Sequence, residues 1–156
     1  MIERTQFVKN CLRKEIVFSD LDDAGLSSIV SLAVEATIPP GAVLYRQGDP
    51  SAGFYIITSG AVRLLVGMAK DGTGGREVLT ISAGNCFGAM DVLEETPRPH
   101  SAMAIDPVCL VAIDRRDFEA LLASDVKVAE SIIRSVEKHL ATETTSSPGA
   151  MKCRPD

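Results

Sequence analysis

The sequence has little histidine, and this scarcity limits the chemistry that the chain can perform. His100 and His139 are the only histidines among 156 residues. A metal-dependent enzyme needs clustered histidine and carboxylate ligands, yet His100 falls in a predicted loop and His139 in a predicted helix. No Ser-His-Asp or Cys-His arrangement stands out. We therefore expect no catalytic residue, no metal site and no cofactor.

Paired cysteines are missing as well. The four cysteines are Cys11, Cys86, Cys109 and Cys153, and none of them forms a C-x-x-C pair. Cys86 and Cys109 have apolar neighbours, so we interpret them as small core residues. This pattern favours a reduced, cytosolic protein without a disulfide framework.

Long apolar runs and an excess of basic residues are also absent. No run approaches the roughly 20 residues that cross a membrane, and the first residues lack the apolar core of a secretory signal. Lys and Arg number 16 against 21 Asp and Glu, a net charge of −5, whereas a nucleic-acid binder usually carries a basic face. We expect a cytoplasmic chain that binds neither membrane nor nucleic acid directly.

What is present fits one globular domain with helices at both ends. Residues 1–17 carry a partial helical stripe, and we expect them to form an N-terminal helical extension. A helix capped by Ser19 follows, with Leu26, Ile29, Val30 and Ala33 on one buried face. Near the C-terminus, Asp114 caps a short helix and Ser124 a longer one, in which Glu130 and Arg134 can pair. Residues 141–156 are expected to be a disordered tail.

The middle of the chain consists of short apolar runs separated by turn residues. We predict strands at Glu35–Ile38, Val43–Tyr45, Phe54–Thr58, Ala61–Val66, Glu77–Ile81, Ser101–Ile105 and Val108–Ile113. Turn signals such as Gly48-Asp49-Pro50 lie between them. Many short strands at this spacing are typical of a β-sandwich or barrel.

One segment carries residues suited to an anion. Gly88 precedes a helix-competent run, Ala89–Glu94, and a helix start with a glycine lets backbone N–H groups approach a phosphate. Arg98 follows at a distance that allows its planar guanidinium to fold back over that helix start. The plainer interpretation is a common glycine before a one-turn helix and a solvated arginine.

The order of the motifs resembles the cyclic nucleotide-binding domain family, the sensor module of catabolite activator-type transcription factors, protein kinase A regulatory subunits and cyclic nucleotide-gated channels. The resemblance covers residues 18–140. It rests on Pro40-Gly41-x-x-Leu44-x-x-Gln47-Gly48-Asp49, Phe54-Tyr55-Ile56-Ile57-x-x-Gly60-x-Val62, Gly84-x-x-Phe87-Gly88 and Pro97-Arg98-x-x-Ser101. It implies a mainly β fold, a double-stranded β-helix (jelly roll) flanked by N-terminal and C-terminal helices.

The resemblance also implies a ligand site, the phosphate-binding cassette between Phe87 and Ser101, with cAMP or cGMP as the possible ligand. In the family an arginine at the position of Arg98 pairs with the cyclic phosphate. Backbone groups that follow the glycine complete the cradle, and inward strand residues wall the base and sugar. The residues assigned to the site are Leu64, Thr80, Phe87, Gly88, Ala89, Met90, Arg98, Pro99, His100 and Ser101.

Two positions depart from the family pattern. The family has Phe-Gly-Glu where this chain has Phe87-Gly88-Ala89, so the acceptor for the ribose 2′-hydroxyl is missing. Pro99 stands where the residue after the arginine gives its backbone N–H to the phosphate, and proline has no N–H. His100 can supply a donor nearby, or it is a partly exposed loop histidine.

These observations leave two functions. The first is a sensor that binds a cyclic nucleotide or related phosphate anion and signals through its C-terminal helices. The second is a degenerate domain that no longer binds cyclic nucleotide and acts in protein interaction or dimerisation, with the 126–140 helix as a possible homodimer contact. Only sixteen residues follow Leu140, too few for a helix-turn-helix domain.

Overall fold

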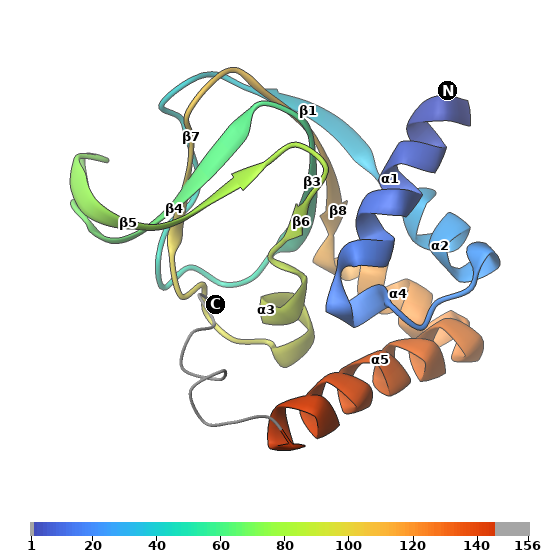
Figure 1. Ribbon diagram of the computed structural model, residues 1–156. Coiled ribbons are helices and arrows are strands. Elements are labelled where there is room, and N and C mark those ends of the chain that lie inside the picture. Colours follow the sequence, from blue (N-terminus) through green and yellow to red (C-terminus); the bar gives the residue numbers. More distant parts are fainter. Residues whose placement is uncertain (1, 146–156) are drawn as a thin grey trace.

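The chain forms two antiparallel four-stranded sheets beside a layer of helices (Figure 1). The computed structural model describes residues 2–145, with side chains described from residue 4 to residue 140. The strands are β1 (Val34–Ile38), β2 (Val43–Tyr45), β3 (Gly53–Ser59), β4 (Ala61–Met68), β5 (Gly74–Ser82), β6 (Cys86–Phe87), β7 (Ser101–Ala104) and β8 (Val108–Asp114). The helices are α1 (Ile2–Lys14), η1 (Ile16–Phe18), α2 (Asp23–Val30), α3 (Ala89–Glu94), α4 (Arg115–Ser124) and α5 (Val126–Thr145).

The strand order confirms the predicted jelly roll. One sheet has the order β1-β8-β3-β6 and the other β2-β7-β4-β5, so each sheet combines strands from both halves of the chain. All seven predicted strands are present. The sequence prediction missed β6, which has two residues and pairs with Tyr55 and Ile56 of β3. A strand this short carries no readable alternation of apolar and polar residues.

The molecule has two hydrophobic cores that share the β3–β8 sheet. One core fills the space between the two sheets and includes Ile57, Val62 and Leu110. The other joins the outer face of the β3–β8 sheet to the helices and centres on Phe18, Phe54 and Phe118. Side chains alternate between the two faces of a strand, so neighbouring residues of β3 serve different cores.

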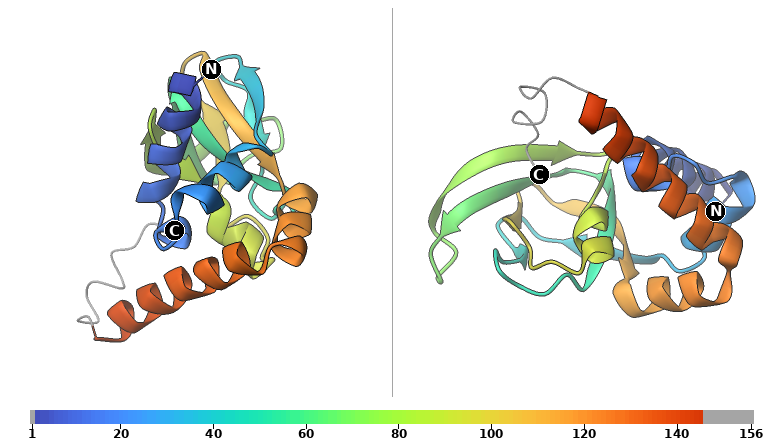
Figure 2. Two further views of the ribbon diagram at one scale, coloured as in Figure 1. Left: turned by 90° about the vertical axis from the view of Figure 1, so that its right-hand side faces the viewer. Right: turned by 90° about the horizontal axis from the view of Figure 1, so that it is seen from below.

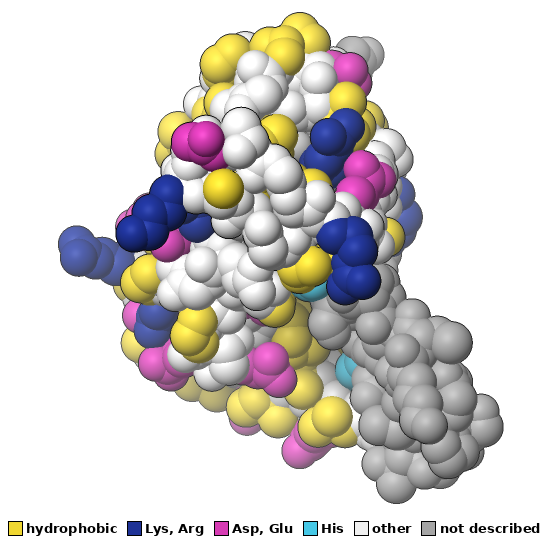
Figure 3. All heavy atoms as spheres, turned by 90° about the vertical axis from the view of Figure 1, so that its left-hand side faces the viewer, with side chains coloured by type: hydrophobic (Ala, Val, Ile, Leu, Met, Phe, Trp, Pro, Cys, Tyr) yellow, Lys and Arg dark blue, Asp and Glu magenta, His cyan; other side chains and the backbone are white. Residues whose placement is uncertain are grey.

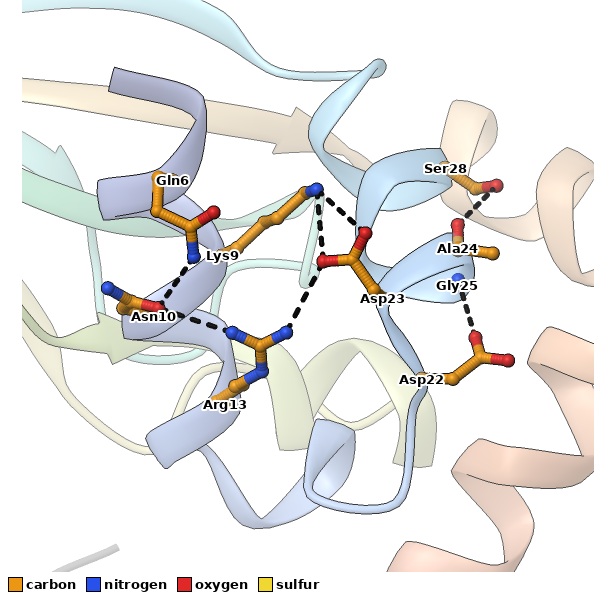
Figure 4. Close-up of polar contacts among 9 residues, drawn as sticks. All are labelled: Gln6, Lys9, Asn10, Arg13, Asp22, Asp23, Ala24, Gly25 and Ser28. Carbon is orange, nitrogen blue, oxygen red and sulfur yellow. Dashed lines mark hydrogen bonds and ion pairs between the residues drawn. The ribbon is translucent and has the colours of Figure 1, made fainter. Parts of the chain in front are cut away.

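The N-terminal helices belong to the second core rather than standing apart from it. Val8 and Leu12 of α1 are buried there. On the outer side, Lys9 and Arg13 of α1 both contact the Asp23 carboxylate at the start of α2 (Figure 4). The prediction that Ser19 caps α2 is wrong. Asp22 is the N-cap residue, and its carboxylate accepts a hydrogen bond from the Gly25 N–H at 2.8 Å.

The C-terminal helices begin close to the predicted positions. Asp114 caps α4 as predicted, because its carboxylate accepts hydrogen bonds from the backbone of Arg116 and Asp117. The α5 helix is capped by Asp125 rather than Ser124, since Asp125 Oδ1 accepts from the Val128 N–H. It continues to Thr145, so residues 141–145 are helical and not part of a disordered tail. Residues 146–156 lie outside the described residues.

Two further sequence interpretations need correction. Cys109 is exposed, because it points away from the core between the buried residues Val108 and Leu110 of β8. The interpretation of Cys86 as a core residue is confirmed, because its half-buried side chain packs against the second core and burial is the main cause that raises the pKa of its thiol. Arg134 does not pair with Glu130 in the structure. Its Nε lies 2.8 Å from Asp20 Oδ2, a contact between residues far apart in the sequence.

Within residues 2–145, the length and apolar character that a membrane-crossing helix requires are found in none of the helices. In α5, which has 20 residues, charged side chains recur along the helix.

Phe18 of η1 is buried in the core between the β3–β8 sheet and the helices, which we call the helix-to-sheet core. Its ring centroid lies 5.4 Å from that of Phe54 and 6.1 Å from that of Phe118. We expect Phe18→Ala to lower the free energy of unfolding by about 3–5 kcal/mol. The control Phe7→Ala removes a ring that is 40% exposed on α1 and should cost less than about 1 kcal/mol. Denaturant unfolding followed by circular dichroism checks this, and equal effects would contradict it.

Candidate functional site

A cavity of about 800 Å³ lies between the jelly roll, α3 and α5. This volume is within the range of small-molecule sites in proteins. Figure 3 views the molecule from the side of β4 and β5 and shows hydrophobic and acidic side chains gathered on the lower part of that face.

The strand wall of the cavity is apolar. It is formed by Tyr45 of β2, Leu64 of β4, and Leu79 and Ile81 of β5. Thr80 was expected here but lies on the opposite face of β5, where its hydroxyl donates to Glu77 Oε2 at 2.6 Å. Because neighbours on a strand point to opposite faces, the two residues that flank Thr80 take the inward positions.

The cassette residues form the floor of the cavity. Phe87, Gly88, Ala89 and Met90 all line it. Gly88 is the N-cap of α3 and has a φ of +88°, a left-handed conformation that favours glycine. A Cβ atom at this position would also lie 2.7 Å from Arg98 Nη1. Gly88 is thus required both for the turn into α3 and for the close approach of Arg98.

Arg98 is buried beneath the cassette and does not line the cavity. It is 2% exposed. Its Nη1 donates to the Gly88 carbonyl oxygen at 3.2 Å and to Asp91 Oδ2 at 3.4 Å, and its Nη2 donates to the Gly53 carbonyl oxygen. Arg98 Nε is buried without a hydrogen-bond partner. The guanidinium is therefore occupied mainly by backbone carbonyls and one carboxylate.

Aromatic rings enclose the guanidinium on its other side. The Arg98 Cζ atom lies 4.1 Å from the centroid of the Tyr45 ring, within the range of a cation–π contact. The Tyr55 ring lies 5.3 Å from that of Phe87 and 6.2 Å from that of Tyr45. Burial raises the pKa of the Tyr45 phenol, so this residue remains neutral.

The loop that leads to β7 divides its residues between the cavity and the core. Pro99 and His100 line the cavity. Ser101 is buried and turned away from it, and its hydroxyl accepts a hydrogen bond from the Gln47 N–H at 2.9 Å. Hydrogen bonds to the Gly48–Asp49 turn also hold the Arg98 backbone. The Arg98 N–H donates to the Asp49 carbonyl oxygen, and the Arg98 carbonyl oxygen accepts from the Gly48 N–H, each at 2.8 Å.

The α5 helix forms a further wall of the cavity. The sequence did not lead us to assign this helix to the site. Ile132, Ile133, Val136 and Leu140 line the cavity, together with Glu137 and His139. The apolar stripe of this helix was recognisable, but a stripe does not show what it packs against. Ile132 is also part of the helix-to-sheet core, so one helix serves both the core and the cavity.

Asp20, between η1 and α2, attaches α5 to the N-terminal helices. Its carboxylate contacts Lys138 Nζ at 2.5 Å and Arg134 Nε at 2.8 Å. Its backbone N–H donates to the buried Ser135 hydroxyl at 2.8 Å. The hydrogen bonds from Lys138 and then Arg134 lower the pKa of the Asp20 carboxyl. The attachment thus holds the part of α5 that also supplies cavity-lining residues, and Figure 2 shows this helix beside the N-terminal helices.

Comparison with known proteins identifies this arrangement. Residues 35–125 match the family model of the cyclic nucleotide-binding domain. The chain belongs to this family. The matched segment runs from β1 to the end of α4 and contains the cassette, Arg98 and the strand wall of the cavity. The family is a regulatory binding domain, and no group of three or more metal-ligating side chains occurs among the described residues.

Individual relatives agree with this assignment. The chain is 32% identical over 127 residues to the cAMP-dependent protein kinase regulatory subunit of Pyricularia oryzae, covering 77% of this chain and 33% of that protein. Its fold matches the N-terminal domain of a transcriptional regulator from Streptomyces coelicolor, with a TM-score of 0.74, 25% identity, and coverage of 90% and 98% of the two chains. The catabolite activator protein of Thermus thermophilus matches with a TM-score of 0.62 and 27% identity, over 83% and 60% of the chains.

The chain spans about a quarter to a third of the length of the curated relatives it matches. The share is 25% to 33% for the kinase regulatory subunits of Pyricularia oryzae, Eremothecium gossypii and Blastocladiella emersonii. The likeness therefore concerns one domain of larger proteins.

The burial of Arg98 predicts a structural role in addition to any role in binding. Arg98→Ala removes the side-chain donor to the Gly53 carbonyl, one of two donors to the Gly88 carbonyl and the ion pair with Asp91, so we expect the free energy of unfolding to fall by about 2–4 kcal/mol. Arg116→Ala, on the exposed side of α4, should change it by less than about 0.5 kcal/mol. Chemical denaturation of both variants checks this. A stability equal to that of the wild type for Arg98→Ala would contradict the geometry.

The Asp20 attachment predicts a local effect on α5. Asp20→Asn should speed amide hydrogen exchange around residues 133–140, with Glu130→Gln on the same helix as the control for charge removal. Because the folded pKa of Asp20 is lowered, the ionic attachment is complete above the unfolded pKa, about 3.9, and is lost as pH falls through the folded pKa. Exchange unchanged in Asp20→Asn at pH 7 would show that apolar packing alone positions α5.

Proposed function

We propose that this chain is a ligand-sensing regulatory domain that takes a small molecule into the cassette cavity and signals its occupancy through α5. Cyclic nucleotides, cAMP and cGMP, and related phosphate anions are the ligands that the family assignment nominates. The observation that carries the proposal is that α5 residues line the same cavity as the cassette. A ligand that contacts both must favour one position of α5 over others.

The second candidate is a protein-interaction or dimerisation module that has lost the cyclic nucleotide. Three observations favour it: Ala89 offers no acceptor, Pro99 offers no N–H, and the guanidinium of Arg98 is already bonded to Gly53, Gly88 and Asp91. Ile133 and Leu140 are 55% and 56% exposed on α5, an apolar surface that suits a homodimer through the 126–140 segment. For either function we propose a cytoplasmic location and no enzymatic step, membrane contact or nucleic acid.

Calorimetric titration with cAMP and cGMP separates the two. Replacing Ala89 by Glu restores a charged acceptor beside the ligand, and such a hydrogen bond contributes about 1.5–3 kcal/mol. We expect Ala89→Glu to bind cAMP about tenfold or more tightly than the wild type, and Pro99→Ala to add a smaller gain from the regained N–H. Arg98→Ala is unsuitable as the control because it also destabilises the fold.

The outcomes assign the function. Binding by the wild type, with slower amide exchange in α5 on saturation, supports the sensor. A silent wild type that self-associates, with association weakened by Ile133→Glu, supports the interaction module. Failure of the Ala89→Glu, Pro99→Ala double variant to bind either nucleotide would contradict the cassette as a nucleotide site.

A further inference from the structure

The carboxylate of Asp91, in the first turn of α3, takes part both in the cavity and in the bonding of Arg98. Asp91 lines the cavity, and its side chain is 21% exposed. Its Oδ2 atom lies 3.4 Å from Nη1 of the buried Arg98. Among the described residues, Asp91 is the carboxylate that pairs with this arginine. A partly accessible negative charge therefore neutralises the buried positive charge behind the cassette.

The contact between the two side chains is long for an ion pair. Charge-assisted N–H···O bonds of this kind are usually about 2.7–2.9 Å long, and arginine often forms two in parallel with one carboxylate. Here Arg98 Nη1 contacts Asp91 at 3.4 Å and also donates to the Gly88 carbonyl oxygen at 3.2 Å. Arg98 Nε is buried without a hydrogen-bond partner. The pair thus neutralises charge without using every donor of the guanidinium.

The charges of this pair act at the cavity, although the guanidinium does not line it. Gly88 lines the cavity, and a Cβ atom on Gly88 would lie 2.7 Å from Arg98 Nη1, the same nitrogen that contacts Asp91. Tyr45 also lines the cavity. Burial is the main cause that raises the pKa of its phenol, while Arg98 lowers that pKa and Asp91 raises it. A charged ligand group at the cassette therefore meets both members of the pair.

An anionic ligand that turns to Arg98 competes with Asp91 for it. Asp91 is held beside the guanidinium by the chain, so its effective concentration there is high and does not depend on the concentration of ligand. If the carboxylate moves aside, the ligand replaces an existing ion pair instead of gaining a new one. If the carboxylate stays, two negative charges share one cation and repel each other. Either course weakens the binding of the anion.

We propose that Asp91 is the residue that sets the affinity of this cassette for an anion, because it is an internal anion that competes with the ligand's phosphate for Arg98. The proposal rests on the sensing function proposed above and keeps its phosphate ligand. Ala89 and Pro99 remove contacts that a cyclic nucleotide could use, whereas Asp91 adds a competitor. The threshold of the sensor therefore depends on a side chain that can be exchanged without altering the fold.

Titration calorimetry with cAMP and adenosine measures the competition, because the two share base and sugar and differ by the cyclic phosphate. Asp91→Asn keeps the shape of the side chain and removes its charge. We expect Asp91→Asn to bind cAMP about tenfold more tightly than the wild type and to bind adenosine with unchanged affinity. An equal or lower affinity for cAMP in Asp91→Asn would overturn the proposal, and so would an equal gain for adenosine.

Glu94→Gln is the matched control. It removes a carboxylate from the same helix and the same cavity lining, but from a residue that does not pair with Arg98. It should change the affinity for cAMP far less than Asp91→Asn does. An equal gain in Glu94→Gln would assign the effect to the general charge of the lining and contradict the competition for Arg98. Circular dichroism of both variants checks that each is folded under the conditions of the titration.

The Nε–Hε signal of Arg98 in a nitrogen-15 NMR spectrum gives a second measurement. We expect cAMP to shift this signal in Asp91→Asn at a lower concentration than in the wild type, because the guanidinium no longer has to leave a carboxylate. A signal that stays in place when Asp91→Asn is saturated with cAMP would show that Arg98 is not the cation for which the anions compete.

The outcomes distinguish this inference from the proposed function. Equal affinity of the wild type and Asp91→Asn for cAMP, with slower amide exchange in α5, supports the sensor and overturns the competition. Binding of cAMP by Asp91→Asn alone supports the competition and contradicts sensing of this nucleotide by the wild type. Binding by neither protein contradicts both.

Discussion

A buried guanidinium fixes the part of the molecule on which the cavity depends. Arg98 donates to the Gly53 carbonyl at the start of β3 and to the Gly88 carbonyl and the Asp91 carboxylate of the cassette. A charge with so little exposure is stable only when it is bonded in this way. The bonds lock α3 against the β3 strand and leave Ala89 and Met90 at the cavity floor. The shape of the site therefore depends on an interaction that lies outside the site.

The α5 helix connects the cavity to the remainder of the fold. Val128 and Ile132 pack in the helix-to-sheet core, while Val136 and Leu140 line the cavity one and two turns further on. The interaction of Asp20 with Arg134 and Lys138 is exposed and screened by salt, so it positions the helix without fixing it as rigidly as the core does. A ligand that touches Val136 contacts α5 beside the Asp20 attachment, at a residue that also packs against the helix-to-sheet core. Such a ligand shifts the position of α5 only by as much as its contacts differ between the positions of the helix.

Local patterns predicted the fold because each element carries its own signal. Strands between turn residues and a helix after Gly88 were all recognisable, and Asp114 capped its helix as expected. The alternation of apolar and polar residues at Leu79, Thr80 and Ile81 indicates that Leu79 and Ile81 face the cavity and Thr80 faces away. The resemblance to the family had suggested Thr80 as an inward residue instead. No local sequence pattern indicated where the Arg98 side chain points or which carboxylate pairs with Arg134. A long side chain reaches several acceptors, and the Asp20 carboxylate lies 114 residues away in the sequence.

The family assignment and the chemistry of the cavity answer different questions. The family model describes strands, turns and the glycine at position 88, which are the features that make a jelly roll with a cassette. The ligand depends on a few side chains that the fold does not constrain, among them Ala89 and Pro99. Neither departure from the family pattern disturbs the core, since Ala89 is small and Pro99 is exposed in the loop before β7. A fold can therefore stay the same while the side chains that decide its ligand change.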